Sequence, residues 1–136
     1  MINITNSQLN NDTINALNNL MELDIRSGIA FKLMRIIKDI SSLYEDKQLM
    51  EKKIFDKCVE RDSFNNPAKV FDENGKEIEG AVRIKDMKLF QEEMDSLLNY
   101  NNVLTHSKIN FEHLGIDSSN TTLKIKDIMK IDFLFE

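Results

Sequence analysis

The chain has 136 residues, of which 41% are hydrophobic; this length suits one domain and is enough to fold without a metal or a disulfide. Its 18 basic and 23 acidic side chains give a net charge of −5, and the whole acidic surplus lies in residues 62–136, so we expect no direct binding to nucleic acid phosphates. The single cysteine excludes an internal disulfide, no apolar run approaches the ~20 residues that span a bilayer, and we expect no membrane association and no secretory signal.

The first half of the chain predicts a short strand and two helices. Residues 1–5 alternate apolar and polar side chains, which favours a strand. Asn6 and Ser7 are candidate N-caps of a first helix that reaches about Leu23. Residues 28–58 then predict one long helix, because apolar residues recur there in steps of four and three and no proline interrupts them. This heptad seam consists of Ile29, Leu33, Ile36, Ile40, Leu43, Lys47, Met50, Ile54 and Cys58.

The width of the apolar stripe changes along this long helix. Phe31, Ile37 and Tyr44 widen its first half, whereas the second half keeps only a thin seam. A broad stripe is typical of burial in a core, and a thin seam is typical of contact with one or two helices. We therefore expect the helix to have a buried root and a projecting tip.

Residues 69–84 predict a β-hairpin. Asn74-Gly75 lies between two stretches rich in β-forming residues, and this dipeptide favours a type I′ turn, in which both central residues have positive φ. Gly80 marks either a bulge or the end of the pairing. Asp86 is then the predicted N-cap of a third helix that ends at residues 99–102. Because the connection is short, the third helix is expected to run antiparallel to the second.

The C-terminal part is less regular. Residues 103–111 share one alternating pattern and predict a strand, and residues 123–125 predict another short strand. Residues 127–131 predict one or two helical turns. The chain then ends in Phe133, Leu134 and Phe135, which either dock back onto the core or present aromatic anchors to a partner.

Together these elements predict an α+β fold. We expect a long antiparallel helical hairpin with a β-hairpin at its tip, a shorter N-terminal helix and short terminal strands. The chain would form a single domain over residues 1–136. Its root would comprise residues 1–43 with 103–136, and residues 44–102 would form a projecting arm.

No motif in the sequence points to catalysis or to a cofactor. His106 and His113 lie seven residues apart, which does not match zinc-ligand spacing, and Cys58 occupies a seam position where cysteine acts as a small hydrophobe. Serine-nucleophile and glycine-rich phosphate-binding motifs are missing from the sequence. We therefore expect no catalytic, cofactor-binding or metal-binding residues. An enzyme built from the two histidines and nearby carboxylates stays as a minor alternative.

Two groups of surface charges, one basic and one acidic, each allow two interpretations. Lys32, Arg35 and Lys38 lie three residues apart on one flank of the long helix, where they form either a contact patch for an anion or an ordinary solvated surface interrupted by Asp39. Likewise, the acidic surplus of the second half either keeps the chain soluble or docks onto a basic groove of another protein.

The order of these elements resembles a domain of unknown function found in small bacteriophage and prophage proteins of low-GC bacteria. The resemblance is carried by the helix segments at 29–33, 44–47 and 90–98, the hairpin Phe71-Asp72-Glu73-Asn74-Gly75-Lys76 and the C-terminal apolar segment. The abundance of Asn, Ile and Lys also fits an AT-rich phage genome. No functional residues can be carried over from that family.

We therefore hypothesise a non-enzymatic phage protein that acts in the host cytoplasm by binding another protein. The leading form of this hypothesis is an inhibitor that docks an acidic surface onto a host defence complex, such as CRISPR-Cas, or onto a regulatory complex. The candidate partner-binding residues are Asp72, Glu73, Asn74, Lys76, Glu92, Glu93 and Asp95, with Phe133 and Phe135.

The alternative hypothesis is a virion or assembly accessory protein, such as a tail, neck or scaffold component. In that case the heptad seam would mediate homo-oligomerisation, and the partner would be a phage protein or a second copy of this chain.

Overall fold

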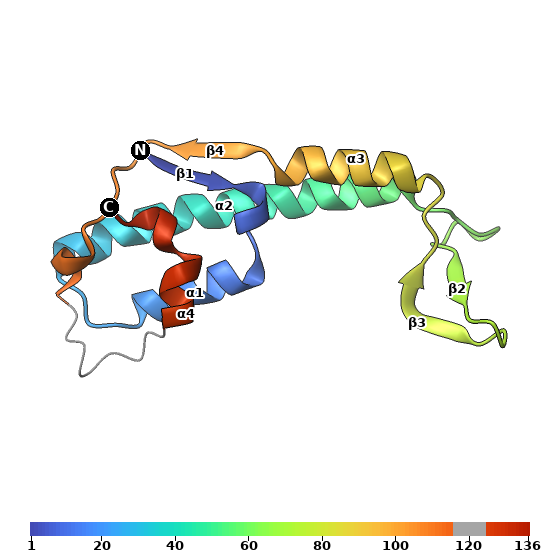
Figure 1. Cartoon of the computed structure of the whole chain (residues 1–136), viewed down its shortest axis with the longest axis horizontal. Helices are drawn as coiled ribbons and strands as arrows, with labels where there is room; N and C mark the ends of the chain where they lie inside the picture. Colours follow the sequence, from blue (N-terminus) through green and yellow to red (C-terminus); the bar gives the residue numbers. More distant parts are fainter. Residues whose placement is uncertain (116–124) are drawn as a thin grey trace. The chain divides into compact units, whose positions relative to one another are not determined.

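The computed structural model describes residues 1–115 and 125–136 and confirms the predicted mixed α+β fold (Figure 1). The chain divides into two compact units. Unit 1 comprises Met1–Lys47 and Leu98–Glu136, and unit 2 comprises Gln48–Leu97. The sequence-based division placed these boundaries at residues 43/44 and 102/103, which is a few residues away in each case.

Helix α2 (Ser27–Cys58) is a single helix of 32 residues and contributes to both units. Its continuity follows from the sequence, because proline is missing from this segment and its one glycine, Gly28, lies in the first turn. In the described part of the chain, no helix is both long and apolar enough to cross a membrane.

Unit 1 contains a two-stranded antiparallel sheet. Strand β1 (Ile2–Thr5) pairs with β4 (Asn101–Leu104), so that Ile2 lies opposite Leu104. The predicted strand at 103–111 is therefore wrong in extent. The side chains of His106 and Ser107 bond to residues of α2 instead, and Ile109 forms an isolated parallel bridge with Phe135.

The N-terminal helix begins later than predicted. Residues Asn6–Gln8 form a short 3₁₀ turn, η1, and α1 follows at Asn11–Met21. The N-cap is Asn10, whose side-chain oxygen accepts a hydrogen bond of 3.0 Å from the backbone N–H of Thr13. This bond satisfies one of the N–H groups that a helix leaves unpaired at its start.

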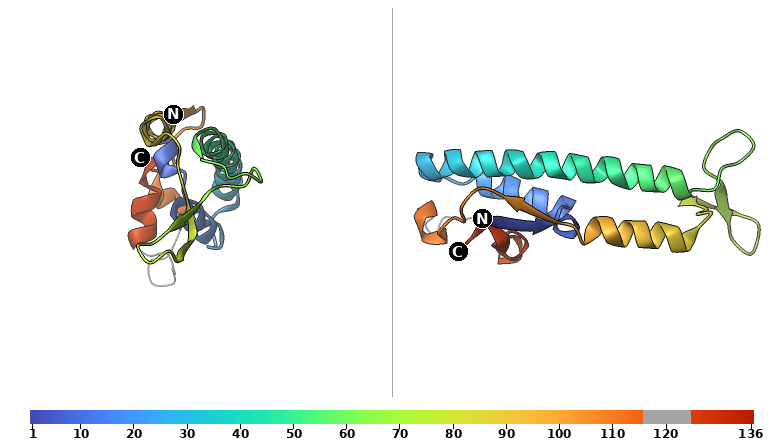
Figure 2. Two further views of the ribbon diagram at one scale, coloured as in Figure 1. Left: turned by 90° about the vertical axis from the view of Figure 1, so that its right-hand side faces the viewer. Right: turned by 90° about the horizontal axis from the view of Figure 1, so that it is seen from above.

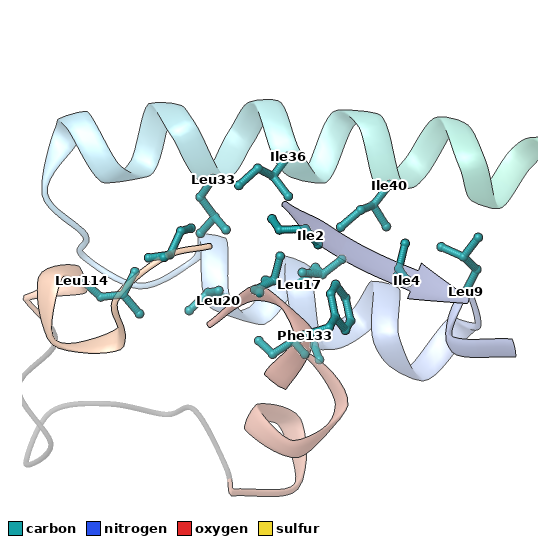
Figure 3. Packing of buried hydrophobic residues seen from close by; sticks show 14 residues of the cluster. Ile2, Ile4, Leu9, Leu17, Leu20, Leu33, Ile36, Ile40, Leu114 and Phe133 are labelled. Carbon is teal, nitrogen blue, oxygen red and sulfur yellow. The ribbon is translucent and has the colours of Figure 1, made fainter. Parts of the chain in front are cut away.

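The core of unit 1 lies between β1, α1 and the first half of α2. Leu33, Ile36 and Ile40 of α2 are fully buried, and Figure 3 shows their side chains pointing toward β1 and α1. The remaining buried apolar residues come from seven other segments: Ile2, Ile4, Leu9, Ala16, Leu17, Leu20, Ile109, Leu114, Ile131, Phe133 and Leu134. The first half of the predicted seam is thus buried within this chain.

Two residues of α2, Lys47 and Phe31, depart from a simple apolar stripe. Lys47, the one charged residue of the seam, donates a hydrogen bond of 2.6 Å from Nζ to the carbonyl oxygen of Leu9, so its ammonium group satisfies a backbone acceptor. Phe31 was expected to widen the buried stripe, but 59% of it is exposed. That expectation is wrong because the buried face is centred on Leu33, Ile36 and Ile40, and position 31 points to another side of the helix.

The C-terminal segment consists of short helices. Residues Phe111–Leu114 form the 3₁₀ helix η2, Ile125–Lys130 form α4, and Asp132–Leu134 form η3. The helical turns predicted at 127–131 correspond to α4 and its end. Of the strand predicted at 123–125, the first two residues lie outside the described residues, and Ile125 begins α4 rather than a strand.

Unit 2 is built on an antiparallel helical hairpin, as predicted. The last turns of α2 run alongside α3 (Met87–Leu98), as the views in Figures 1 and 2 show. Asp86 caps α3, since its Oδ1 accepts a hydrogen bond of 3.0 Å from the N–H of Leu89. The described apolar residues that are buried in this unit are Ile54, Cys58 and Val59.

A small β structure closes the helical hairpin. Strand β2 (Lys69–Phe71) pairs antiparallel with β3 (Glu77–Val82). The register shifts between Lys69 and Phe71, and Gly80 has a φ of 77°, so Gly80 belongs to a β-bulge or irregularity rather than to the end of the pairing.

Three backbone segments meet at the base of this hairpin. Glu60 N–H donates to the carbonyl of Arg83 at 2.8 Å, Arg83 N–H donates to Ala68 at 3.0 Å, and Ala68 N–H donates to Glu60 at 2.8 Å. These bonds form a closed triangle. They connect the second residue after α2, the residue before β2 and the residue after β3 to one another. The ends of the loops that start at these residues are therefore fixed.

Candidate functional site

The loop that joins β2 to β3 is organised by Asp72. Its Oδ1 accepts hydrogen bonds of 2.9 Å from the N–H groups of both Asn74 and Lys76, and its backbone N–H donates to the carbonyl of Lys76 at 2.8 Å. Gly75 N–H in turn donates to the carbonyl of Asp72 at 3.0 Å. We call residues Asp72–Lys76 the Asp72 loop.

The predicted type I′ turn is wrong at this loop. Gly75 has a φ of 80°, but Asn74 does not have a positive φ, so a single residue adopts the left-handed conformation. The loop Glu73-Asn74-Gly75 thus resembles the three-residue hairpin connection in which glycine occupies the left-handed position. The Asp72 carboxylate favours this turn because it accepts two backbone N–H groups that point into the loop.

A second loop repeats this geometry ten residues earlier. The Oδ1 of Asp62 accepts from the N–H groups of Phe64 and Asn66, at 2.9 and 3.0 Å, and Asp62 N–H donates to the carbonyl of Asn66 at 2.8 Å. Asn65 N–H donates to the carbonyl of Asp62 at 3.0 Å, and Asn65 has a φ of 64°. We call residues Asp62–Asn66 the Asp62 loop.

The flanking residues also correspond. Arg61 and Pro67 form an antiparallel bridge around the Asp62 loop, and Phe71 pairs with Glu77 around the Asp72 loop. Both loops therefore span the same number of residues in the same register. Arg61 further secures the first loop by donating from Nη1 to the carbonyl of Asn65 at 3.0 Å.

Phe64 lies at the centre of the Asp62 loop, where the Asp72 loop has Asn74. It is 84% exposed, the most exposed large hydrophobic residue among those described. A phenylalanine in this position does not fill the core, and its backbone N–H is already bonded to Asp62. The aromatic ring of Phe64 is therefore exposed to solvent on a loop whose backbone conformation is fixed by hydrogen bonds.

The structure places the predicted partner-binding residues of the hairpin in two classes. Asp72 holds the loop together, as described above. Glu73, Asn74 and Lys76 are exposed and have their side chains on the surface of the same loop. These three residues are therefore available for contact with a partner, and Asp72 contributes by shaping the loop.

The predicted carboxylates of α3 also comprise one residue that is bonded within unit 2 and two that are exposed. Glu93 Oε1 accepts a hydrogen bond of 2.8 Å from Nζ of Lys57 on α2, and this bond, together with the charge of Glu93, raises the pKa of Lys57. Glu92 and Asp95, by contrast, are exposed. They lie three residues apart on the helix and so share one flank. Glu93 thus joins the two helices of unit 2, and Glu92 and Asp95 face solvent.

Further apolar side chains are exposed in unit 2. Phe71 is 59% exposed, Met87 52% and Ile78 44%. Single exposed apolar residues are common on protein surfaces. Here, however, they accompany Phe64 in a unit whose described buried core is very small.

The aromatic residues at the C-terminus belong to unit 1. Phe133 is only 8% exposed and lies among the core side chains in Figure 3, so its prediction as a partner anchor is wrong. It is buried because η3 folds the end of the chain back over β1 and α1. Of the two alternatives for the C-terminal residues, docking onto the core therefore holds for Phe133. Phe135 is half-buried, and its ring packs edge-on against Phe111 at a centroid distance of 5.2 Å.

The residues considered for chemistry are distributed over the fold. His106 Nε2 lies 2.7 Å from Oδ2 of Asp39, and His113 is exposed on η2. Cys58 is a buried free thiol in unit 2. Over residues 1–115 and 125–136, no group of three or more His, Cys, Asp or Glu side chains is arranged to hold a metal ion.

The sequence analysis did not single out Phe64, because Asp62, Ser63, Asn65, Asn66 and Pro67 around it are turn-forming residues and indicate only a connection. A signal was nevertheless present. Asp62 and Asp72 are each followed three residues later by Asn or Gly, the residue types that tolerate a positive φ. This shared spacing predicts two related loops and marks the residue at the centre of each.

Comparisons with known proteins found no match to this chain among protein-family models, curated proteins or solved structures.

Proposed function

We propose that this protein binds another protein through unit 2, with Phe64 as the principal anchor, and that it acts by binding rather than by catalysis. The observation that carries the proposal is the 84% exposure of Phe64 on a loop fixed by the carboxylate of Asp62. Aromatic residues are over-represented among the side chains that dominate binding energy at interfaces.

The fixed loop matters for affinity. A flexible loop loses conformational entropy when it binds, whereas a loop that already holds its bound conformation avoids most of this cost. Transfer of a phenylalanine side chain from water into a partner's pocket contributes about 1.5–3 kcal/mol. The Asp62 loop combines both advantages, because its backbone hydrogen bonds are satisfied before the partner arrives.

The exposed carboxylates of unit 2 give the proposed surface its polarity. The side-chain carboxylates of Glu73 in the Asp72 loop and of Glu92 and Asp95 in α3 make no hydrogen bond or ion pair to other described residues. Charged groups at an interface influence the rate of encounter and the choice of partner more than the affinity. We therefore propose a partner with an apolar pocket and nearby basic side chains.

The resemblance to phage proteins supplies the biological setting of the proposal. In that setting the chain is an inhibitor, made in the host cytoplasm, of a host defence complex such as CRISPR-Cas or of a regulatory complex. A basic nucleic-acid-binding groove of such a complex would complement the acidic side chains of unit 2.

The test uses the full chain as an immobilised bait in a host lysate, with captured proteins quantified by mass spectrometry. Phe64→Ala is compared with the wild type and with Met129→Ala, a matched control because Met129 is 70% exposed on α4 in unit 1. We expect Phe64→Ala to weaken capture by about tenfold or more, since anchors of this kind contribute about 2 kcal/mol. Capture that is unchanged by Phe64→Ala contradicts the proposal.

The captured protein then allows a second step. Glu73→Lys, Glu92→Lys and Asp95→Lys should each slow association with the purified partner, and the effect should shrink as salt is added. If the partner is a defence complex, wild-type chain should reduce its activity and Phe64→Ala should not. A partner whose activity is unaffected by the bound chain would contradict the inhibitor form of the proposal.

The second candidate function, a virion or assembly component, depends on self-association. Leu33, Ile36 and Ile40 are buried in the core of unit 1, and Ile54 and Cys58 of the distal seam are buried in unit 2. Met50 is therefore the seam residue that is left exposed for a second copy. It is 44% exposed and the adjacent Leu49 is 60% exposed. Sedimentation velocity at micromolar concentration separates the two candidates, because a monomer favours the inhibitor and a ring or long oligomer favours assembly.

A further inference from the structure

An open groove lies on unit 1, in the part of the chain that carries no residue of the proposed protein-binding surface. It has a volume of about 370 Å³ and is lined by Phe31, Lys32 and Arg35 of α2 and by Thr105 and His106, which follow β4. This volume is within the range of small-molecule binding sites. The groove exists because β4 ends at Leu104 and the chain then turns toward α2.

The groove gathers positive charge. Lys32 Nζ donates a hydrogen bond of 2.7 Å to Oγ of Ser107, a neutral partner that orients the ammonium group and leaves its charge uncompensated. The guanidinium group of Arg35 makes no hydrogen bond or ion pair to any described residue. Among the residues that the structure describes, the carboxylate that bonds to a lining residue is that of Asp39, whose Oδ2 lies 2.7 Å from His106 Nε2.

The groove also offers an aromatic surface. Phe31 lies outside the buried face of α2 and is 59% exposed. It lines the groove together with Lys32 and Arg35, so its ring is open to a ligand beside these two cationic side chains. An exposed ring next to an arginine and a lysine suits a ligand that has a flat ring and an anionic group. The guanidinium fork binds phosphate in a bidentate manner, and an aromatic side chain stacks on a base.

We propose that this groove binds a nucleoside monophosphate, with the phosphate held by Arg35 and Lys32 and the base stacked on Phe31. This inference is independent of the proposed protein-binding function, because it uses unit 1 alone. It also chooses between the two interpretations of the basic flank of α2. Lys32 and Arg35 face a common groove, whereas Lys38 does not line it.

The test titrates AMP, UMP, adenosine and inorganic phosphate into the full chain and follows amide and side-chain NMR shifts. We expect both nucleotides to shift the signals of Phe31, Lys32, Arg35 and Thr105, with dissociation constants below those of adenosine and of phosphate. Arg35→Gln should weaken nucleotide binding by about tenfold or more, because a charge-assisted bidentate contact is lost. Phe31→Leu, which stays apolar but cannot stack in the same way, should weaken it by about fivefold.

The matched control is Lys38→Gln, which removes an equal charge from the same flank of α2 without touching the groove. It should leave the dissociation constants within about twofold, as expected for a screened surface charge. The proposal is overturned if the nucleotides cause no shifts at millimolar concentration, or if phosphate alone binds as tightly as AMP. It is also overturned if Lys38→Gln weakens binding as much as Arg35→Gln, since this would indicate a general charge effect.

Discussion

Asn65 and Gly75 occupy equivalent positions in two loops of unit 2 and adopt the same left-handed backbone conformation, with φ values of 64° and 80°. Each donates its N–H to the carbonyl of an aspartate three residues earlier, Asp62 or Asp72. The two loops therefore share one hydrogen-bonding scheme although the leading aspartate is the one residue that their sequences have in common. This equivalence allows the conformational cost of the backbone to be separated from the role of the exposed side chains.

The left-handed conformation predicts opposite effects of substitution in the two loops. Asn65→Gly should raise the free energy of unfolding by about 0.5–1 kcal/mol, because glycine adopts a positive φ without steric cost. Gly75→Ala should lower it by about 1–2 kcal/mol. A β-carbon at Gly75 would meet no atom within 4 Å, so this loss would come from the backbone alone. Urea denaturation checks both values, and a stabilising Gly75→Ala would contradict the loop geometry.

The aspartate carboxylates should be needed for both loops. Asp62→Ala removes the acceptor of two backbone N–H groups, of Phe64 and Asn66, and should destabilise unit 2 by about 1–2 kcal/mol. Asp62→Asn keeps a side-chain oxygen at the same place and should recover most of that loss. Amide hydrogen exchange of Phe64 and Asn66 measures this directly. Equal protection in Asp62→Ala and the wild type would show that the carboxylate does not hold the loop.

The ion pair between the helices of unit 2 should be visible in the titration of Lys57. Its pKa lies above the ordinary value of 10.5 because Glu93 accepts a hydrogen bond from it and lies next to its charge. A raised folded-state pKa means that the pair stabilises the fold fully below pH 10.5, and that this contribution is lost as the pH rises through the folded-state pKa.

Glu93→Gln should therefore lower the pKa of Lys57 toward its ordinary value. NMR titration of the Lys57 side chain measures the change. Glu92→Gln is the matched control because Glu92 directly precedes Glu93 in α3 and faces solvent. An identical titration of Lys57 in the wild type and in Glu93→Gln would show that the two side chains do not interact in solution.

Adjacent residues of α2 should differ strongly in their contribution to stability. Leu33 is fully buried in the core of unit 1, and Met34 is 49% exposed. Leu33→Ala should destabilise the protein by about 2–5 kcal/mol through lost apolar burial and a residual cavity, whereas Met34→Ala should cost about 0.5 kcal/mol or less. Thermal denaturation of the two variants distinguishes them. Similar losses would mean that α2 turns a different face to the core.

Several elements followed from the sequence because their signals were local and strong. The seam of α2 repeats over eight turns without a helix breaker, and Asp86 precedes the apolar face of α3 as a cap should. The hairpin between Lys69 and Val82 was also correctly placed by Asn74-Gly75. In each case the residues that specify the element lie within it.

The parts that could not be predicted depend on contacts between distant residues. The strand expected at 103–111 ends early because His106 and Ser107 bond to Asp39 and Lys32, more than sixty residues away in the chain. Phe133 was placed among the surface anchors because the pattern around it does not show that η3 folds back onto the core. The basic groove of unit 1 likewise joins α2 to residues after β4, and no local pattern brings these together.

The most direct test of the proposed function is the affinity of the purified partner for three matched variants of the Asp62 and Asp72 loops. Phe64→Ala, Asn74→Ala and Asn65→Gly are compared with the wild type by calorimetry. We predict that Phe64→Ala raises the dissociation constant by about tenfold or more, that Asn74→Ala has a smaller effect, and that Asn65→Gly leaves it within about twofold because the loop keeps its shape. A dissociation constant that Phe64→Ala does not change would contradict the assignment of Phe64 as the anchor.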